Sequence, residues 1–154
     1  MKRVDQVDPA LRAAKTSDLE AVHSLLRAAQ LPVEGLADQF GDQYVVAESE
    51  TGPIIGAAGV ELYNAAGLLR SVVVLDEHRG TGLGERLTRD RIAWCRGRGL
   101  QEIYLLTTTA APFFARHGFE TVPRSSAPAS LQASREFAAI CPSTAVCMRL
   151  GLRK

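Results

Sequence analysis

The sequence predicts a single domain, residues 1–154, of the mixed α/β (α+β) class. Between residues 44 and 75, apolar and β-branched segments are separated by short turns, which is typical of antiparallel hairpins. From residue 68 onward, strand-like segments alternate with helix-like segments. A chain of 154 residues is long enough to bury one ordinary core, and no linker or internal repeat divides it.

The composition is that of a globular protein. The net charge is +1, with 46% hydrophobic against 23% charged residues, which excludes the basic excess of a nucleic-acid binder and the polarity of a disordered chain. No segment approaches the ~18 apolar residues of a membrane span, and no apolar run follows the basic start as in a signal peptide. Cys95, Cys141 and Cys147 lack the spacing of a disulfide framework, which favours reduced thiols. We expect a cytoplasmic protein without nucleic-acid or membrane partners.

The N-terminal part is expected to form a short strand at 10–14 followed by a helix at 16–30. Apolar residues recur through the second segment at helical spacing. Ser17 and Glu20 match a capping box at its start. A short second helix is expected within 33–40.

Three strands are expected next, at 44–49, 53–63 and 68–75. Each is rich in β-branched or other apolar residues. Gly52–Pro53 and the segment 64–67 separate them as tight turns.

The C-terminal half predicts further alternation. A glycine pair after residue 96 ends the first of its helices, and Gly118 suits a left-handed cap after the second. The expected elements are a helix at 82–96, a strand at 102–107, a short helix at 110–117, a loop at 123–130, one or two helical turns at 131–140 and a last strand at 144–150.

Three glycines stand where the strand at 68–75 leads into the helix at 82–96. Gly80, Gly82 and Gly84 permit a turn that exposes several main-chain N–H groups. The helix dipole adds partial positive charge at the same place. This arrangement predicts a phosphate or pyrophosphate site; the alternative is a glycine-rich connection without a ligand.

Two nucleotide-binding motifs do not fit this turn. A P-loop, G-x-x-x-x-G-K-[ST], would need a second glycine where Glu85 stands, and the turn has no lysine. The dinucleotide pattern G-x-G-x-x-G would need its third glycine at Glu85 or at Leu87. The pattern that fits is R-x-x-G-x-G, formed by Arg79, Gly82 and Gly84.

This motif resembles the acyl-coenzyme-A-binding motif of the GCN5-related N-acetyltransferases (GNATs). "LLRSVVVLDEHRGTGLGERL" is similar to that family's strand, loop and helix, and "IYLLTTTAAPFFARHGF" to its later strand and helix. The similarity covers about residues 44–122. It implies a mixed, mostly antiparallel central sheet splayed at its middle and flanked by helices, with acetyl-CoA bound in the opening. The cofactor-binding residues it implies are Val72, Val73, Val74, Arg79, Gly80, Thr81, Gly82, Leu83, Gly84, Glu85 and Phe114.

The same resemblance implies how these residues act. The amides of residues 80–85 would hold the pyrophosphate, and Val72 and Val74 would pair with the pantetheine arm as an added strand does. A main-chain N–H near Val73 would stabilise the oxyanion. Arg79 would steady the turn or meet a phosphate, with a solvated arginine as the alternative.

A narrower likeness lies outside these motifs. "LPVEGL" and "APASLQASREFAAICPSTAVCM" resemble glutamate N-acetyltransferases and, more closely, arsenic-resistance N-acetyltransferases. This implies an acetyl-CoA-dependent transferase whose acceptor is a small amine, an amino acid or its arsenic-containing analogue. A general base is expected at Glu61, acting directly or through a water, with an exposed strand glutamate as the alternative.

Candidate acceptor-binding residues flank the expected reaction centre. Arg70 is expected to pair bidentately with a substrate carboxylate, or else to face solvent, and Ser71 follows it in the strand. Glu34 is expected to receive an ammonium or to shape its loop. The family's proton-donating tyrosine is replaced by Phe114, which leaves the general acid open, with Tyr104 and Ser143 as remote candidates.

Two other functions stay open at this point. Without the tyrosine, the chain could bind or sense acyl-CoA without turnover. A thiol-based arsenite-binding protein would use its cysteines, whereas no H-x₃-H or C-x₂-C spacing predicts a metal site. The oligomeric state is open too, although a closing strand at 144–150 would suit a homodimer, as in many relatives.

Overall fold

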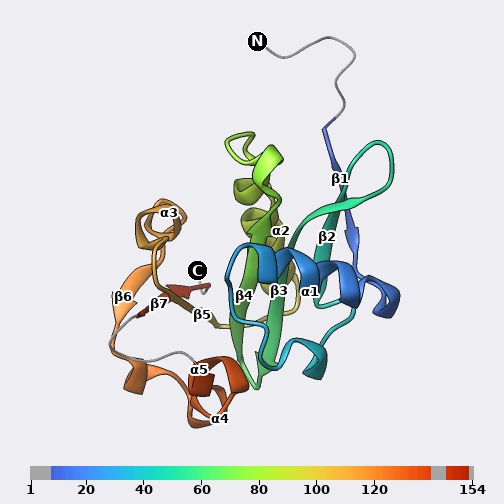
Figure 1. Ribbon diagram of the computed structural model, residues 1–154. Helices are drawn as coiled ribbons and strands as arrows, with labels where there is room; N and C mark the ends of the chain where they lie inside the picture. Colours follow the sequence, from blue (N-terminus) through green and yellow to red (C-terminus); the bar gives the residue numbers. More distant parts are fainter. Residues whose placement is uncertain (1–7, 140–144, 153–154) are drawn as a thin grey trace.

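The computed structural model describes residues 8–139 and 145–152 (Figure 1). Within them a seven-stranded sheet has the order β1-β2-β3-β4-β5-β7-β6. The pair β4–β5 is parallel and the other neighbours are antiparallel. The strands are β1 Ala10–Ala13, β2 Tyr44–Glu48, β3 Ile54–Tyr63, β4 Ala66–Val74, β5 Glu102–Thr107, β6 Glu120–Val122 and β7 Val146–Gly151. The predicted fold class is confirmed.

Helices cover both faces of this sheet. In Figure 1, α1 crosses the front of the central strands and α2 lies behind them, while the short helices α3, α4 and α5 gather around the β5–β7 side. The α-helices are α1 Leu19–Ala28, α2 Leu83–Gly97, α3 Ala111–Ala115, α4 Ala129–Gln132 and α5 Arg135–Ala139, with single 3₁₀ turns at Thr16–Asp18, Leu36–Asp38, Asp76–His78 and Arg124–Ser126. In the described part of the chain, no helix has both the length and the apolar character to cross a membrane.

The central strands are buried on both faces because successive side chains point to opposite sides. In β2, Val46 packs in the cluster that includes the α1 residues Val22 and Leu26. Its neighbour Val45 packs instead in the cluster that includes Leu87 of α2. A core therefore forms on each side, and the sheet holds α1 and α2 at fixed positions.

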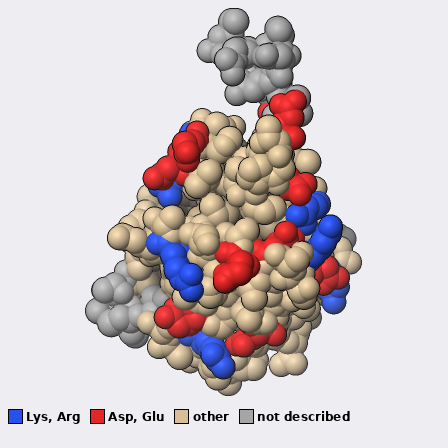
Figure 2. Space-filling view, turned by 45° about the vertical axis from the view of Figure 1, so that its right-hand side comes forward, with Lys and Arg blue, Asp and Glu red and all other residues tan. Residues whose placement is uncertain are grey.

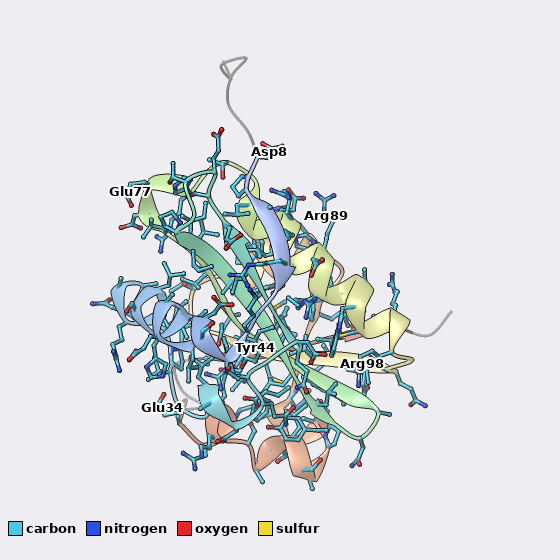
Figure 3. All side chains as sticks on the ribbon, turned by 90° about the vertical axis from the view of Figure 1, so that its right-hand side faces the viewer. Asp8, Glu34, Tyr44, Glu77, Arg89 and Arg98 are labelled. Atoms are coloured by element: carbon cyan, nitrogen blue, oxygen red, sulfur yellow. The ribbon has the colours of Figure 1, made fainter. Side chains whose placement is uncertain are left out.

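A glycine in β3 makes room for an aromatic ring. Tyr44, which lies inside the molecule in Figure 3, packs its ring over Gly59. A Cβ at Gly59 would stand 2.1 Å from that ring, so a side chain there would displace Tyr44.

The sheet splays between β4 and β5. These strands pair only at their first residues, from Ala66↔Glu102 to Leu68↔Tyr104. Beyond this point β4 stays with β3, whereas β5 pairs with β7 along its whole length. The predicted opening at the middle of the sheet is therefore present.

A β-bulge deforms β4 beside the opening. Gly59 pairs with Arg70 and Ala57 with Val73, so β4 carries one extra residue here. Ser71 within the bulge has φ 62°, a conformation that non-glycine residues seldom adopt. The bulge redirects this part of β4 relative to a regular strand.

Two local expectations were wrong. The first helix begins with a 3₁₀ turn, and Asp18 accepts from the Lys15 main-chain N–H (2.8 Å) in place of the Ser17–Glu20 box. Asp18 also binds Arg12, an ion pair that fixes the carboxylate at this turn. Strand β6 was not expected, since three residues at a sheet edge carry little periodic signal.

Candidate active site

A cavity of about 750 Å³ lies where β4 and β5 diverge. Residues from the segment after α1 and from β5, α3 and α5 complete its walls. The predicted residues that line it are Arg70, Ser71, Val72, Val73, Val74, Arg79, Gly80, Gly82, Gly84, Glu85 and Phe114. The opening in the sheet is therefore a pocket, and the glycine-rich turn forms part of its wall.

The turn presents unpaired main-chain donors. Among the described residues, no amide from residues 80–85 donates to a main-chain or side-chain acceptor within the protein. Gly80 (φ 78°) and Gly82 (φ 87°) take left-handed conformations that open the turn. Because α2 begins at Leu83, its dipole adds positive potential. These donors suit an anion of the size of a diphosphate.

Side chains of the turn itself help to hold it in shape. Thr81 Oγ1 donates to the His78 carbonyl (2.6 Å), and Arg79 Nε donates to the Val74 carbonyl (3.3 Å). Arg79 also pairs with Asp76 at 3.1 Å. Neither Thr81 nor Leu83 is among the residues that line the cavity, and Leu83 is buried in the core instead. Of the roles expected for Arg79, these contacts favour steadying the turn.

A buried charge cluster lies at the other end of the cavity. Arg70 Nη1 donates to Glu61 Oε2 (3.2 Å), and Arg70 Nε lies 3.1 Å from Glu136 Oε1. The three residues are 2%, 2% and 4% exposed, respectively. Tyr63 Oη donates to the second Glu61 oxygen, at 2.7 Å. One guanidinium therefore faces two carboxylates in a region shielded from water.

The same guanidinium ties three segments together. It donates to the carbonyls of Glu34 (2.7 Å) and Pro32 (3.3 Å) in the loop after α1, and its Nε donates to Ser71 Oγ (3.0 Å). Through Glu136 it also reaches α5. Arg70 thus fixes the α1–η2 loop and α5 against β4, where η2 is the turn Leu36–Asp38.

Glu136 is the residue that sequence reasoning missed. It lines the cavity, and burial is the main cause that raises its pKa to about 7; nearby Arg70 acts in the opposite direction. A carboxyl group with that pKa can exchange a proton near neutral pH. The sequence carried no signal for it, because a glutamate in a short helix ordinarily faces solvent.

The structure changes the interpretation of three predicted residues. Glu61 and Arg70 are buried, so the solvent-exposed alternatives for both were wrong. Glu61 is not among the residues that line the cavity and lies behind Arg70. Glu34 has an exposed side chain (Figure 3), and its main-chain carbonyl accepts a hydrogen bond from Arg70.

Aromatic rings form one wall. Phe114 is buried and stands edge-on to Phe113 and Phe119, with ring centroids 5.0 Å and 5.9 Å away. Phe114 lines the cavity, but its ring has no acidic proton to donate to a leaving thiolate. Tyr104 Oη donates to the Ser126 carbonyl (3.1 Å) and does not line the cavity, while Ser143 lies outside the described residues.

The thiols of the described cysteines are protonated core groups. Cys95 and Cys147 are buried in different apolar clusters. Burial raises the pKa of Cys95 to about 12 and also raises that of Cys147. Cys141 lies outside the described residues, and no group of metal-ligating side chains occurs among those that are described. These two cysteines give no support to a thiol-based arsenite site.

The face seen in Figure 2 carries acidic and basic side chains in alternation, with apolar or uncharged surface between them. No broad patch of one sign appears on this face. It has no concentration of charge of the kind that would attract a polyelectrolyte.

Comparison with known proteins identifies this architecture. A family model described as "Acetyltransferase (GNAT) domain" matches residues 40–121, more than half of the chain. An uncharacterised N-acetyltransferase of Chlorobaculum tepidum is 23% identical over 155 residues, covering 96% of each chain.

Solved structures agree with this match. N-acetylglutamate synthase from Neisseria gonorrhoeae, in complex with coenzyme A and N-acetylglutamate, superimposes with a TM-score of 0.81 at 19% identity. The match covers 97% of this chain and 36% of the synthase, so the chain spans about a third of that relative. A Mycobacterium tuberculosis protein in complex with CoA has a TM-score of 0.76 at 23% identity, covering 94% of this chain and 100% of that one.

Proposed function

The chain belongs to the GNAT acetyltransferases and is an acyltransferase, and on that premise we propose that it transfers the acetyl group of acetyl-CoA to the nitrogen of a small amine. The two reactants would meet in the cavity between β4 and β5. The cofactor enters at the glycine-rich turn and the amine at the charge cluster.

The cofactor site follows the length of β4. The unpaired amides of residues 80–85 bind the diphosphate, and the pantetheine arm lies along Val72 and Val74 toward the bulge. The thioester then reaches the region of Ser71. The aromatic wall containing Phe114 supports the arm from the β5 side.

Catalysis depends first on alignment. Holding thioester and amine together can contribute ~7–11 kcal/mol relative to free encounter. A main-chain N–H of the bulge near Val73 stabilises the oxyanion, and one such donor is typically worth ~10²–10³ in rate. The bulge at Ser71 supports this role because it turns the strand away from regular pairing.

The amine must also lose a proton. An alkylammonium has a pKa near ~10, so roughly one molecule in a thousand is neutral at pH 7. We assign the base to Glu136 in place of Glu61, because Glu136 lines the cavity and has a pKa of about 7. Glu61 acts behind it by holding Arg70. The thiolate leaves with a proton from water, or unprotonated, since its pKa is near ~8–9.

The acceptor class follows from the resemblance and not from a bound ligand. An amino acid or its arsenic-containing analogue is the acceptor it implies. The synthase among the structural relatives was solved with N-acetylglutamate, which is consistent with such an acceptor.

One observation carries this proposal: a buried carboxyl group that titrates near neutrality shares a cavity with the unpaired amides of the turn. The test measures acetyl-CoA binding by calorimetry and thiol release over a panel of amines. In Glu136→Gln, kcat/KM should fall ~10²–10⁴-fold with unchanged acetyl-CoA affinity. The matched control Glu120→Gln changes an exposed glutamate of β6 and should behave as wild type.

Three results would contradict parts of the proposal. Wild-type turnover in Glu136→Gln would remove that residue as the base. Tight coenzyme binding without thiol release for any amine would support the acyl-CoA-binding or sensing module. Absence of coenzyme binding would reject the whole assignment.

A further inference from the structure

The acceptor end of the cavity is defined here by Pro32, Arg70, Ser71, Leu106 and Glu136. It lies about four residues along β4 from Val74, which is roughly 13 Å in a strand. Its chemistry differs from that of the turn, and this difference bears on which amines can bind.

The only cation among these five residues is already engaged. The Arg70 guanidinium meets Glu34 O, Pro32 O, Glu61 Oε2, Ser71 Oγ and Glu136 Oε1, all within 3.3 Å. Its side chain has 0% exposure. A bidentate contact with a substrate carboxylate needs two free N–H groups on one edge of the guanidinium. The contacts within the protein already occupy both Nη1 and Nε of Arg70.

The charge cluster at this end has no net positive charge. One guanidinium stands against the carboxylates of Glu61 and Glu136, so the cluster carries −1 when both are ionised and 0 when Glu136 is protonated. Glu34 adds a further negative charge near Glu136, where it raises that residue's pKa.

Other cations are placed elsewhere. The remaining basic residues that line the cavity, His78, Arg79 and Arg116, belong to the turn and to the end of α3, beside the proposed phosphate site. Residues 140–144, which follow α5, contain no Lys, Arg or His. Within the described chain, nothing at the acceptor end is left to neutralise an added carboxylate.

Apolar residues adjoin this end of the cavity. Ala29, Leu31 and Pro32 line it from the α1 side, and Leu106 lines it from β5. Such walls favour an aliphatic or aromatic substituent on the amine. The amine's own ammonium, by contrast, is attracted by the Glu136 carboxylate before it loses its proton.

Resting on the acetyl transfer proposed above, we propose that the site selects primary amines with an apolar substituent and no carboxylate beside the reacting nitrogen. An α-amino acid would place its carboxylate near that of Glu136, with Arg70 already paired to Glu61 and Glu136 and no unpaired cation to receive it. This narrows the acceptor class away from the amino acid that the resemblance implies.

Matched pairs of acceptors test this selection. L-leucine is compared with 3-methylbutylamine, and L-phenylalanine with 2-phenylethylamine; each pair differs only in the carboxylate. We expect kcat/KM to favour the carboxylate-free member by on the order of 10-fold or more, since like charges placed together are strongly disfavoured. The carboxylate-free amines have the higher pKa, so the fraction of neutral nitrogen favours the amino acids and cannot produce this preference. Equal or better use of the amino acids overturns the inference.

A variant tests the cause of the selection. Glu61→Gln removes one negative charge from Arg70 while leaving Glu136 in place, so the preference for the carboxylate-free member should narrow several-fold. The exposed control Glu120→Gln should leave it unchanged. An unaltered preference in Glu61→Gln refutes the role of the cluster.

Binding measurements separate this inference from the proposed function. Calorimetry on the coenzyme-bound protein compares 3-methylbutylamine with L-leucine without relying on turnover. Tighter binding of L-leucine overturns the selection even if acetyl transfer is confirmed. Preferential binding of the amine without thiol release supports the selection and counts against the transfer.

Discussion

Arg70→Met is expected to lower the stability of the protein substantially. Methionine keeps much of the length and the apolar stem but removes every donor of the guanidinium. It leaves the carboxylates of Glu61 and Glu136 buried without their cation. It also leaves the Pro32 and Glu34 carbonyls without the donor that ties their loop to β4.

The magnitude follows from these lost contacts. Removing one partner of a buried ion pair costs about 3–5 kcal/mol, and each buried carbonyl left unpaired costs about 1–3 kcal/mol unless water reaches it. Because the loop can open and let water reach the two carbonyls, we count only the cost of the broken ion pair, about 3–5 kcal/mol in total. A domain of this size loses ~2–4 °C in Tm per kcal/mol, so the expected fall is roughly 6–20 °C.

The cost should depend on pH. Without Arg70, the pKa of Glu136 rises above the wild-type value of about 7, because the attraction that lowered it is gone. At pH 6 Glu136 is then protonated, so Arg70→Met loses less stability. At pH 8 more of Glu136 is ionised, so the loss of stability is larger. Neutralising both acids, in Arg70→Met with Glu61→Gln and Glu136→Gln, should recover much of the loss at pH 8.

Urea unfolding at pH 6 and pH 8, followed by circular dichroism, measures these differences. Arg70→Lys is the matched control, since it keeps the charge but not the fork, and should lie between wild type and Arg70→Met. If Arg70→Met unfolds within about 0.5 kcal/mol of wild type at pH 8, the range of a neutral surface change, the cluster does not hold the acceptor end together.

The remaining predictions concern the turn, the base and the thiols. Gly84→Ala puts a methyl group 3.8 Å from Val74, an ordinary contact, so it should fold at least as well as wild type while the added methyl weakens coenzyme A binding in calorimetry; unchanged affinity would contradict the placement of the cofactor. Glu136 has a pKa of about 7 in the folded protein against an ordinary 4.5, so its contribution to stability is full below pH 4.5 and is lost as pH rises through 7. Glu136→Gln should therefore be more stable than wild type at pH 8, by up to ~3 kcal/mol. Equal stability of the two proteins in urea titrations at pH 8 would count against the raised pKa. The rate should rise with pH around 7 as Glu136 loses its proton, and this limb should be absent from the pH profile of Glu136→Gln. Cys95, buried with a pKa of about 12, should react with iodoacetamide only as the protein unfolds; rapid alkylation of Cys95 in the native state, detected by mass spectrometry, would refute its burial.

Much of the fold was predictable because its signals are local. Runs of apolar and β-branched residues predicted β2 to β5, and the glycines between Val74 and Leu87 predicted a turn with exposed main-chain donors before a helix. Such patterns depend only on residues that are close to one another in the sequence. The short strand β6 was not predicted, because three residues are too few to show the periodicity of a strand.

Apart from β6, the sequence by itself determined the order of strands and helices along the chain. It also determined the glycine-rich turn, because main-chain geometry there depends on which side chains are absent. Only the tertiary structure decided the chemistry of the other end of the cavity. Arg70 and Glu136 lie 66 positions apart in the chain, and nothing local distinguishes Glu136 from a surface glutamate. Folding removes both from water and brings them together beside Glu61. The charge of that cluster underlies the general base and the acceptor selection that we propose.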